Sequence, residues 1–298
     1  MMNASFPAVS RFFSAPDGLK LHLRDYGSSL DPGLPVVCLP GLARSAADFA
    51  PLATALAQGA SGIRRRVIAI DYRGRGLSDR DADWRNYDLN IEHTDILAVL
   101  AATGIEKAIF IGTSRGGLHI MLLGATRPGL MQGAILNDVG PVLETDGLTR
   151  IRGYLGDFPS PASLAEAKAL LKTVMSRQFS NLTEEEWEVF TRLTFEDETG
   201  RFGAKYDPML MKPLEALDLA TPLPTLWPQF EGLREVPLLV IRGGNSDLLS
   251  AATLAEMTKR HPNCETYVVD GQGHAPLLLD AASIERIAGF IAMAEAKA

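Results

Sequence analysis

The sequence predicts an α/β protein with a mostly parallel eight-stranded sheet, helices on both faces, and a helical segment inserted after the sixth strand. Short apolar runs alternate with stretches of helical periodicity, which is typical of a parallel sheet whose strands are joined by helices. The runs are apolar at successive positions, as expected of strands that are buried on both faces. The alternation stops over residues 142–234, where charged helix-like stretches are mixed with proline and aromatic residues.

Eight strands are expected, and the first two form an antiparallel pair. Asp17-Gly18 separates two short runs near the start of the chain and is a strong hairpin signal. The other six runs are expected to pair in parallel. In chain order the predicted strands are residues 11–14, 19–24, 35–39, 67–70, 108–111, 134–136, 238–241 and 266–269.

Several helix ends can be predicted from capping residues. Asn90 is a candidate N-cap for a helix over residues 91–103, and Gly104 provides its stop signal. Ser250 is placed in the same way before the helix-like residues 251–261. Residues 283–296 have the pattern of an amphipathic C-terminal helix.

The long region without a convincing strand is interpreted as a separate helical part. Loops longer than about 15 residues without secondary structure are uncommon in compact domains. The stretches "SLAEAKALLKTVM" and "TEEEWEVFTRL" in this region are helix-like. We therefore expect a helical cap over residues 142–234, inserted into a core formed by residues 1–141 and 235–298.

Composition limits the classes of partner. The chain has 46% hydrophobic and 22% charged residues and a net charge of -7, which gives no basic field for nucleic acid or an anionic membrane surface. The start, "MMNASFPAVSRFF", lacks the pattern of a signal peptide, and no apolar run approaches the roughly 18 residues of a membrane span. Cys38 and Cys264 lie in predicted strands and are expected to be buried free thiols. We expect a cytoplasmic monomer or homodimer that acts on a small molecule.

The stretch "IGTSRGG" contains a candidate nucleophile. Residues 112–116 match G-x-S-x-G between a predicted strand and a helix-like stretch, the setting in which this motif forms a nucleophile elbow. A serine on so sharp a turn holds a strained backbone, and side chains beside it would collide with the strand or the helix. Gly112 and Gly116 remove those collisions, and the helix beginning near Arg115 points the positive end of its dipole at Ser114.

A serine nucleophile needs a base, and the base needs an acid that orients it. Among the five histidines, only His274 follows a predicted buried strand in a glycine-containing loop, where catalytic groups of such sheets gather. For the acid, Asp247 in "LLVIRGGNSDLLS" is favoured over Asp138 in "AILNDVGP". Both satisfy the chain order Ser–Asp–His, and Asp138 is expected to shape the entrance to the insertion instead.

The tetrahedral intermediate of acyl transfer requires backbone donors for its oxyanion. The N–H of Arg115, directly after the nucleophile, is one candidate. The N–H of Leu42, in the loop "LPGLARSAADF", is the other. Gly41 permits a turn that brings the main chain of this loop close to a substrate.

Together these stretches resemble the α/β-hydrolase fold serine hydrolases, and the resemblance covers nearly the whole chain. It rests on "CLPGLARSAADF", "AIDYRGRGLSD", "IGTSRGG", "NDVGP", "RGGNSDLLS" and "GQGHAP" in their usual order. The resemblance implies a hydrolase with a lid and without a metal or organic cofactor. The chain departs from many members at Pro40 and Thr113, where those members have histidine. A serine at position 114 argues against the epoxide-opening and dehalogenating relatives, which use aspartate.

The residues that bind substrate are predicted less directly. Apolar residues of the insertion and nearby loops either line an acyl pocket or form the core of the cap; they are Met209, Trp227, Phe230, Leu248 and Leu249. Arg115 either binds a substrate carboxylate through its guanidinium or, as we favour, pairs structurally away from the substrate.

The leading hypothesis is hydrolysis of a carboxylic ester of a small to medium acyl or aryl group through an acyl-enzyme. The same three side chains would also serve a C–C bond hydrolase of ring-fission products, an amide or lactone hydrolase, or an acyltransferase. A ligand receptor on this fold is the non-catalytic alternative. Its serine would stay unmodified by an organophosphonate.

Overall fold

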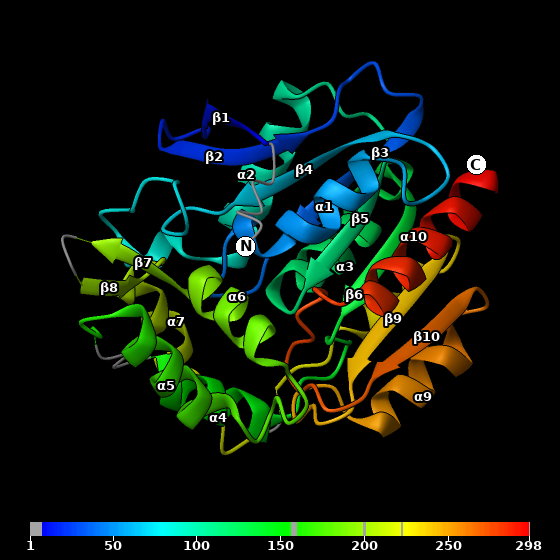
Figure 1. The fold of residues 1–298 in the computed structure, drawn as a ribbon. Helices are drawn as coiled ribbons and strands as arrows, with labels where there is room; N and C mark the ends of the chain where they lie inside the picture. Colours follow the sequence, from blue (N-terminus) through cyan, green and yellow to red (C-terminus); the bar gives the residue numbers. More distant parts are fainter. Residues whose placement is uncertain (1–7, 156–159, 199–200, 222, 298) are drawn as a thin grey trace.

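One eight-stranded sheet forms the centre of the protein, as Figure 1 shows for the computed structural model, which describes residues 8–155, 160–198, 201–221 and 223–297. The strand order is β1-β2-β4-β3-β5-β6-β9-β10. β2 pairs antiparallel with β1 and with β4, and the other neighbouring strands pair in parallel. The predicted α/β class, with an eight-stranded and mostly parallel sheet and helices on both faces, is confirmed. The strands are β1 (Val9–Ser14), β2 (Lys20–Tyr26), β3 (Gly33–Leu39), β4 (Arg65–Asp71), β5 (Ala108–Thr113), β6 (Met131–Asn137), β9 (Leu238–Gly243) and β10 (Cys264–Val269).

The first two strands form the hairpin that Asp17-Gly18 predicts. Phe12 lies opposite His22 in the register of β1 and β2. Gly18 has φ +90°, a left-handed conformation that glycine adopts without steric cost. Asp17 Oδ1 accepts a hydrogen bond from the Leu19 N–H at 3.1 Å, which closes the turn.

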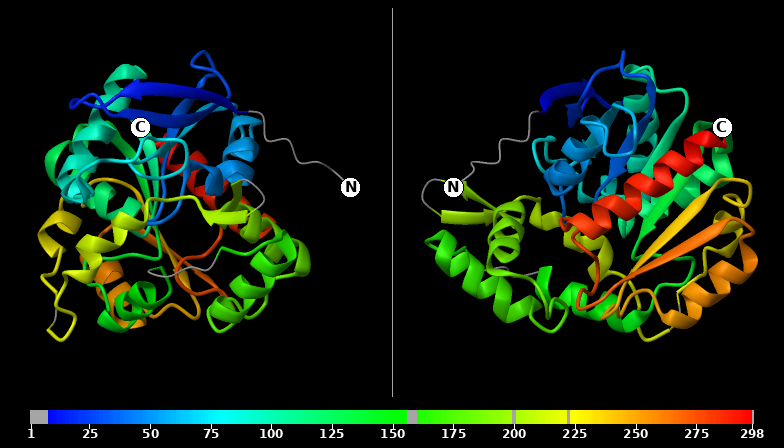
Figure 2. Two further views of the ribbon diagram at one scale, coloured as in Figure 1. Left: turned by 90° about the vertical axis from the view of Figure 1, so that its left-hand side faces the viewer. Right: turned by 45° about the vertical axis from the view of Figure 1, so that its right-hand side comes forward.

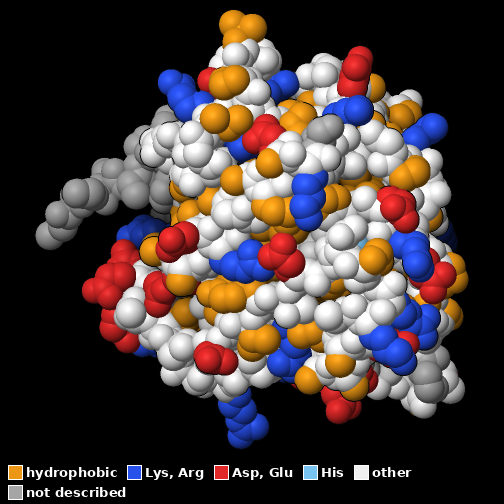
Figure 3. Space-filling model, turned by 90° about the vertical axis from the view of Figure 1, so that its right-hand side faces the viewer, with side chains coloured by type: hydrophobic (Ala, Val, Ile, Leu, Met, Phe, Trp, Pro, Cys, Tyr) orange, Lys and Arg blue, Asp and Glu red, His pale blue; other side chains and the backbone are white. Residues whose placement is uncertain are grey.

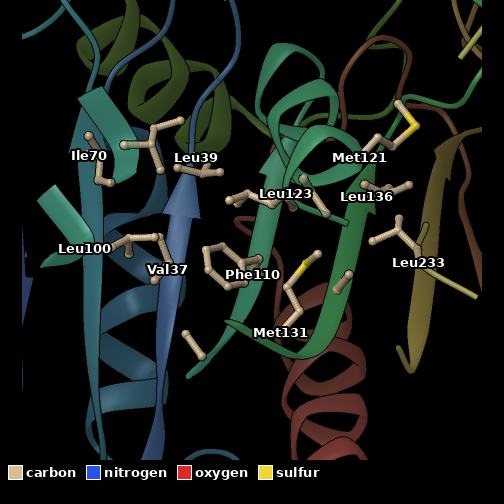
Figure 4. Packing of buried hydrophobic residues seen from close by; sticks show 14 of the residues in the cluster. Val37, Leu39, Ile70, Leu100, Phe110, Met121, Leu123, Met131, Leu136 and Leu233 are labelled. Atoms are coloured by element: carbon tan, nitrogen blue, oxygen red, sulfur yellow. The ribbon is translucent and has the colours of Figure 1, made fainter. Parts of the chain in front are cut away.

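Two helical layers cover the sheet, and each buries alternate residues of the same strands. Val37 and Leu39 of β3 contribute to one hydrophobic cluster, and Val36 and Cys38 contribute to the other. Figure 4 shows part of the first cluster, where Val37 and Leu39 of β3 lie on the same face of the sheet as Phe110 of the neighbouring β5. The first cluster lies under α2 (Leu89–Ala102), α3 (Arg115–Thr126), α8 (Trp227–Glu231) and α9 (Ala251–Arg260), and the second under α1 (Ala50–Ala57) and α10 (Ala281–Ala296).

The helix ends follow local capping chemistry, with one correction to the prediction. Ser250 caps α9 by accepting from the Thr253 N–H, as expected. The N-cap of α2 is Asp88 rather than Asn90, because the Asp88 carboxylate accepts from the Asn90 N–H. Gly104, just after α2, has φ +68° and so allows the chain to leave the helix.

Most of the described residues between β6 and β9 form a second layer beyond the carboxyl ends of the parallel strands. Figures 1 and 2 show its helices and a small hairpin facing the end of the sheet across the site described below. The hairpin was not predicted. The elements are α4 (Thr145–Leu155), α5 (Leu164–Met175), α6 (Glu184–Thr194), β7 (Phe195–Glu198), β8 (Arg201–Ala204) and α7 (Met211–Glu215), and the described 3-10 turns of the chain are Ala46–Phe49, Trp84–Asn86, Pro128–Leu130 and Pro208–Leu210.

This inserted layer ends earlier than the predicted boundary at residue 234. The Leu226 N–H donates to the Pro141 carbonyl at 2.7 Å, so the two ends of the insertion meet there. α8 follows this contact and packs on α3 under the sheet. A Cβ on Gly232 would lie only 2.8 Å from the Ala125 backbone nitrogen. Residues 227–234 therefore pack as part of the core layer.

The surface carries charges of both signs (Figure 3), and the two cysteines are unpaired. In Figure 3, acidic and basic side chains are interspersed with hydrophobic ones over one face. In the described parts of the chain, no helix combines the length and the apolar character needed to span a bilayer. Cys38 is buried and free, whereas Cys264, also free, is only half-buried, which differs from the prediction. Burial raises the pKa of the Cys264 thiol to about 11.

Candidate active site

The turn at Ser114 has the sharp strand–turn–helix geometry expected of a nucleophile elbow. β5 ends at Thr113 and α3 begins at Arg115, which leaves Ser114 alone in the turn with φ 51° and ψ -111°. A Cβ added to Gly116 would lie 2.0 Å from the Leu39 carbonyl oxygen, and one on Gly112 would lie 2.4 Å from the Gly116 carbonyl carbon. Side chains at these two positions would not fit. The strained turn and the glycines around it are thus parts of one arrangement.

Three side chains from three loops are joined by hydrogen bonds. Ser114 Oγ lies 2.9 Å from His274 Nε2. His274 Nδ1 lies 2.8 Å from Asp138 Oδ2. Ser114 follows β5, Asp138 follows β6 and His274 lies in the loop after β10, so the carboxyl ends of the strands bring them together.

Hydrogen bonds other than the one to His274 also fix the position of the Asp138 carboxylate. Its carboxylate accepts from the Gly243 N–H at 2.7 Å and from Ser246 Oγ at 2.6 Å. Its backbone is in the left-handed region, with φ 56°, which aspartate tolerates better than most residues. The side chain is fully buried. A buried carboxylate with partners on both oxygens is suited to orienting a histidine.

The prediction that Asp247 orients His274 is corrected by these contacts. The Asp247 carboxylate pairs instead with Arg150, whose Nε and Nη2 lie 2.5 and 2.8 Å from its two oxygens. It also accepts from Gln178 Nε2 at 3.2 Å. Burial opposes ionisation of Asp247, but the hydrogen bonds from Arg150 outweigh it and lower the pKa of the carboxyl. Asp138, expected only at the entrance of the insertion, occupies the position against the histidine.

Gln178 contacts the histidine loop and was not predicted. It lies just after α5, and its Oε1 accepts from the His274 backbone N–H at 2.9 Å. Its own carbonyl accepts from Asn245 Nδ2 at 3.1 Å. Together with the contact to Asp247, these bonds attach the inserted layer to the loops after β9 and β10. A glutamine beyond a helix end has no sequence signal of such a role.

The residues of the two predicted oxyanion donors, Leu42 and Arg115, lie next to Ser114. Leu42 and Gly41 line the same cavity as Ser114, and a Cβ on Gly41 would be 3.9 Å from Ser114 Cβ. Arg115 is the first residue of α3, where a backbone N–H has no intrahelical acceptor. Both amides are therefore near the nucleophile. The side chain of Arg115 points elsewhere and pairs with Glu92, Nε to Oε2 at 2.5 Å, as the favoured interpretation expects.

A cavity of about 120 Å³ opens beside Ser114 and His274, between the sheet and the inserted layer. For scale, an apolar cavity of roughly 150 Å³ can hold a benzene molecule. The lining is mainly apolar. It includes the guanidinium of Arg44, which pairs with Asp48 at 2.7 Å. Apolar side chains of both layers line the cavity. Those from the insertion include Ile151, Leu155, Leu171, Met175, Phe179, Phe190, Leu193 and Phe195, and those from the core include Leu42, Phe49, Leu277 and Leu278.

Most residues predicted for the substrate pocket lie elsewhere. Gly41 lines the cavity. Trp227 and Phe230 belong to α8 and pack in the core under α3. Leu248 is buried in a separate cluster between the core and α4. Of the other two candidates, Leu249 is also buried in the core and Met209 is exposed. Composition identified apolar residues here but could not show which way they face.

No group of three or more metal-ligating side chains is placed to hold a metal ion within the described ranges. Residues 36–287 match the alpha/beta hydrolase family. The chain therefore belongs to that family.

Particular relatives are similar over nearly the full length. A 3-hydroxybutyrate-oligomer hydrolase from Cupriavidus necator is 34% identical over 91% of this chain and 92% of its own. The esterase YbfF of Escherichia coli is 27% identical over 80% of this chain and 85% of its own. The crystal structure of an α/β hydrolase from Novosphingobium aromaticivorans is 38% identical with a TM-score of 0.88, covering 95% of this chain and 98% of that one.

Proposed function

We propose that the protein hydrolyses carboxylic esters of small to medium acyl groups through an acyl-enzyme on Ser114. The observation that carries this proposal is the continuous hydrogen-bonded chain from Ser114 Oγ through His274 to Asp138, with links of 2.9 and 2.8 Å, at the wall of an apolar cavity. An activated serine beside a largely apolar cavity is suited to attack on an acyl carbonyl.

The reaction follows the chemistry of these groups. His274 Nε2 takes the proton of Ser114 Oγ as the oxygen bonds to the ester carbonyl carbon, and Asp138 stabilises the resulting imidazolium. The carbonyl oxygen becomes an oxyanion that accepts from the N–H groups of Leu42 and Arg115. Collapse breaks the bond to the alkoxy group, which leaves with the proton from His274. Water, deprotonated by His274, then releases the acid and restores Ser114. No cofactor is needed for these steps.

The substrate class rests on the cavity and on the relatives. The apolar wall that α4, α5 and α6 give the cavity suits an acyl chain. We propose that the inserted layer acts as a cap over the bound substrate. The similarity to an oligomer hydrolase and an esterase favours an ester over an amide or a C–C bond. Short esters of 3-hydroxybutyrate are therefore natural candidates beside simple alkanoates.

The test is a series of p-nitrophenyl esters of increasing acyl length and linear 3-hydroxybutyrate oligomers, assayed with wild type and Ser114→Ala. Loss of a triad nucleophile costs on the order of a million-fold in turnover. The exposed Ser176, just after α5, provides the control variant Ser176→Ala, which should retain full activity. Equal rates for wild type and Ser114→Ala would overturn the proposal. Burst kinetics and labelling of Ser114 by an organophosphonate would support the acyl-enzyme.

A further inference from the structure

We propose that a buried ionic cluster fixes the spacing of the two oxyanion amides, with Glu92 and Arg75 as positioning residues for the reaction. The Glu92 cluster consists of Arg75, Glu92, Arg115 and His119. The inference rests on the proposed function only in taking the N–H groups of Leu42 and Arg115 as the oxyanion donors.

Glu92 is the centre of this cluster. It lies in the first turn of α2 and is completely buried. Its Oε1 accepts from Arg75 Nη1 and its Oε2 from Arg115 Nε, each at 2.5 Å. His119 Nε2 lies 3.3 Å from Oε2. Burial opposes ionisation of Glu92, but the two guanidinium groups outweigh it and hold its pKa below the ordinary value. The carboxylate is thus a charged link between two arginines.

Arg75 extends this link to the oxyanion loop. Its Nε donates to the Leu42 carbonyl at 2.8 Å, which fixes the peptide unit after Leu42. The preceding unit contains the Gly41 carbonyl and the Leu42 N–H in one plane. That carbonyl accepts from the Arg44 N–H at 3.2 Å. Two successive peptide planes are therefore held, and the direction of the Leu42 N–H is set.

Arg115 carries the link to the nucleophile side. The carbonyl of Ser114 shares a peptide plane with the Arg115 N–H and accepts from the Gly117 N–H at 2.8 Å, so the first turn of α3 orients this amide. The Arg115 side chain then ties α3 to Glu92. A direct path of hydrogen bonds runs from Leu42 through Arg75 and Glu92 to Arg115.

The chemistry favours a positioning role over a purely stabilising one. Buried ion pairs contribute little net stability, since the desolvation of the charges offsets their attraction. They do hold geometry tightly, because charge-assisted bonds in a dry interior are short and directional. Oxyanion donors act through that geometry, and a displacement of roughly 1 Å can cost on the order of 100-fold in rate.

The chain contains a matched control for this cluster. Arg73 is also buried and also pairs with a carboxylate of α2, Nε and Nη2 to Asp95 at 2.8 Å each. Arg73 additionally pairs with Asp17 and Asp81. Within the part of the chain that the structure describes, the Arg73 side chain makes no hydrogen bond to the loop of Leu42 or to the start of α3. Arg73→Lys therefore perturbs a comparable buried pair without touching the oxyanion amides.

The experiment compares wild type, Arg75→Lys and Arg73→Lys on a p-nitrophenyl ester and on its thiono analogue, in which sulfur replaces the carbonyl oxygen. A lysine at position 75 keeps the charge but offers one flexible nitrogen in place of the two fixed nitrogens, Nε and Nη1, that bond Leu42 and Glu92. We expect kcat for the oxygen ester to fall by roughly 10- to 100-fold with KM nearly unchanged. The oxygen-to-thiono rate ratio should also fall, because sulfur accepts hydrogen bonds weakly and gains less from well-placed donors. Arg73→Lys should leave that ratio unchanged.

Arg115→Met and Arg115→Lys provide a second route if Arg75→Lys does not fold, since the Arg115 side chain lies at the edge of the cluster and is 15% exposed. Arg115→Met should lower kcat and the same ratio, and Arg115→Lys should recover part of both. An unchanged ratio in the folded variants, or an equal fall with Arg73→Lys, would overturn the inference. Failure of the proposed function would appear separately, as wild-type ester hydrolysis that does not depend on Ser114.

Discussion

Asp138 and Asp247 are two carboxylates near the same histidine loop, and their partners separate them. Asp138 is buried against the backbone of β9 and against His274 Nδ1. Asp247 is 27% exposed and balanced by Arg150. An acid that orients a histidine needs a fixed position and a free lone pair for the imidazole, and Asp138 has both. Asp247 is better described as part of the attachment of α4 to the core.

Replacing each aspartate tests this assignment. Asp138→Asn keeps the size of the side chain but presents the wrong hydrogen-bonding group to His274, and kcat should fall on the order of 10⁴-fold. Asp247→Asn should lower kcat by less than about tenfold, since it weakens the contacts to Arg150 and Gln178 but leaves the hydrogen bond between Asp138 and His274 in place. Steady-state kinetics on one p-nitrophenyl ester, with thermal unfolding as a check of folding, measures both. A larger loss in Asp247→Asn than in Asp138→Asn would reverse the roles.

His119 links the Glu92 cluster to the pH dependence of stability. It is completely buried in α3, faces Glu92 and Arg115, and stacks near His93. Burial is the main cause that lowers the pKa of His119 to about 4 from an ordinary value of 6.5. Between these two pH values the unfolded chain binds a proton that the folded chain does not, so the free energy of unfolding decreases as pH falls.

The variant His119→Gln should weaken this dependence. Glutamine can still donate a hydrogen bond toward Glu92 but does not titrate. We expect the slope of unfolding free energy between pH 6.5 and 4 to decrease by up to about 1.4 kcal/mol per pH unit. Urea unfolding at several pH values provides the measurement. Parallel curves for wild type and variant would show that His119 does not contribute to acid destabilisation.

At the scale of elements, the β5–α3 elbow depends on the close contact between the Gly116 segment and the end of β3. A methyl group on Gly116 would overlap the Leu39 carbonyl oxygen, at 2.0 Å. The backbone of a central strand cannot move away cheaply, because it is paired on both sides with β4 and β5. The strain must therefore appear as lost stability and a displaced Ser114.

Glycine-to-alanine changes at Gly116 and Gly289 should change the free energy of unfolding in opposite directions, because only the first creates a steric overlap. Gly116→Ala should destabilise the fold by about 3 kcal/mol or more and abolish ester hydrolysis, because the overlap is with backbone. Gly289→Ala lies on the exposed side of α10 with no atom within 4 Å of the new Cβ. It should stabilise by roughly 0.5–1 kcal/mol, since alanine is the better helix former. Thermal unfolding of both variants decides; a stable, active Gly116→Ala would contradict the packing described here.

At the scale of the whole molecule, local sequence patterns predicted the strands and the Ser114 turn. Long-range packing determined the partner of His274 and the residues that line the cavity. The strands, the first hairpin and the elbow have signals within a few residues of sequence. The choice between Asp138 and Asp247 depends on which side chain reaches His274 across β6 and β9, and no local pattern encodes that. Phe230 likewise is a large apolar residue of the kind that lines pockets, and only its packing under α3 shows that it does not line the cavity.

The cavity shows the same dependence, because its wall is assembled from both layers of the molecule. Ser114 and His274 come from the core, whereas Leu193 comes from α6 of the insertion. All three line the same cavity. If the insertion sets the length of acyl group that fits, a larger side chain at Leu193 should shorten it. Val189 lies one turn earlier in α6, is 38% exposed and does not line the cavity.

Leu193→Phe and Val189→Phe form a matched pair for this last prediction. In Leu193→Phe, kcat/KM for hexanoyl and octanoyl esters should fall by roughly 10- to 100-fold, since one to three kcal/mol is the range for a methylene-scale change of fit. Acetyl ester hydrolysis should change little, because the short chain does not reach α6. Val189→Phe should leave the whole acyl-length profile as in wild type. An equal fall in kcat/KM for all acyl lengths in Leu193→Phe would contradict this prediction. It would show that the acyl group binds elsewhere and that α6 does not select acyl length.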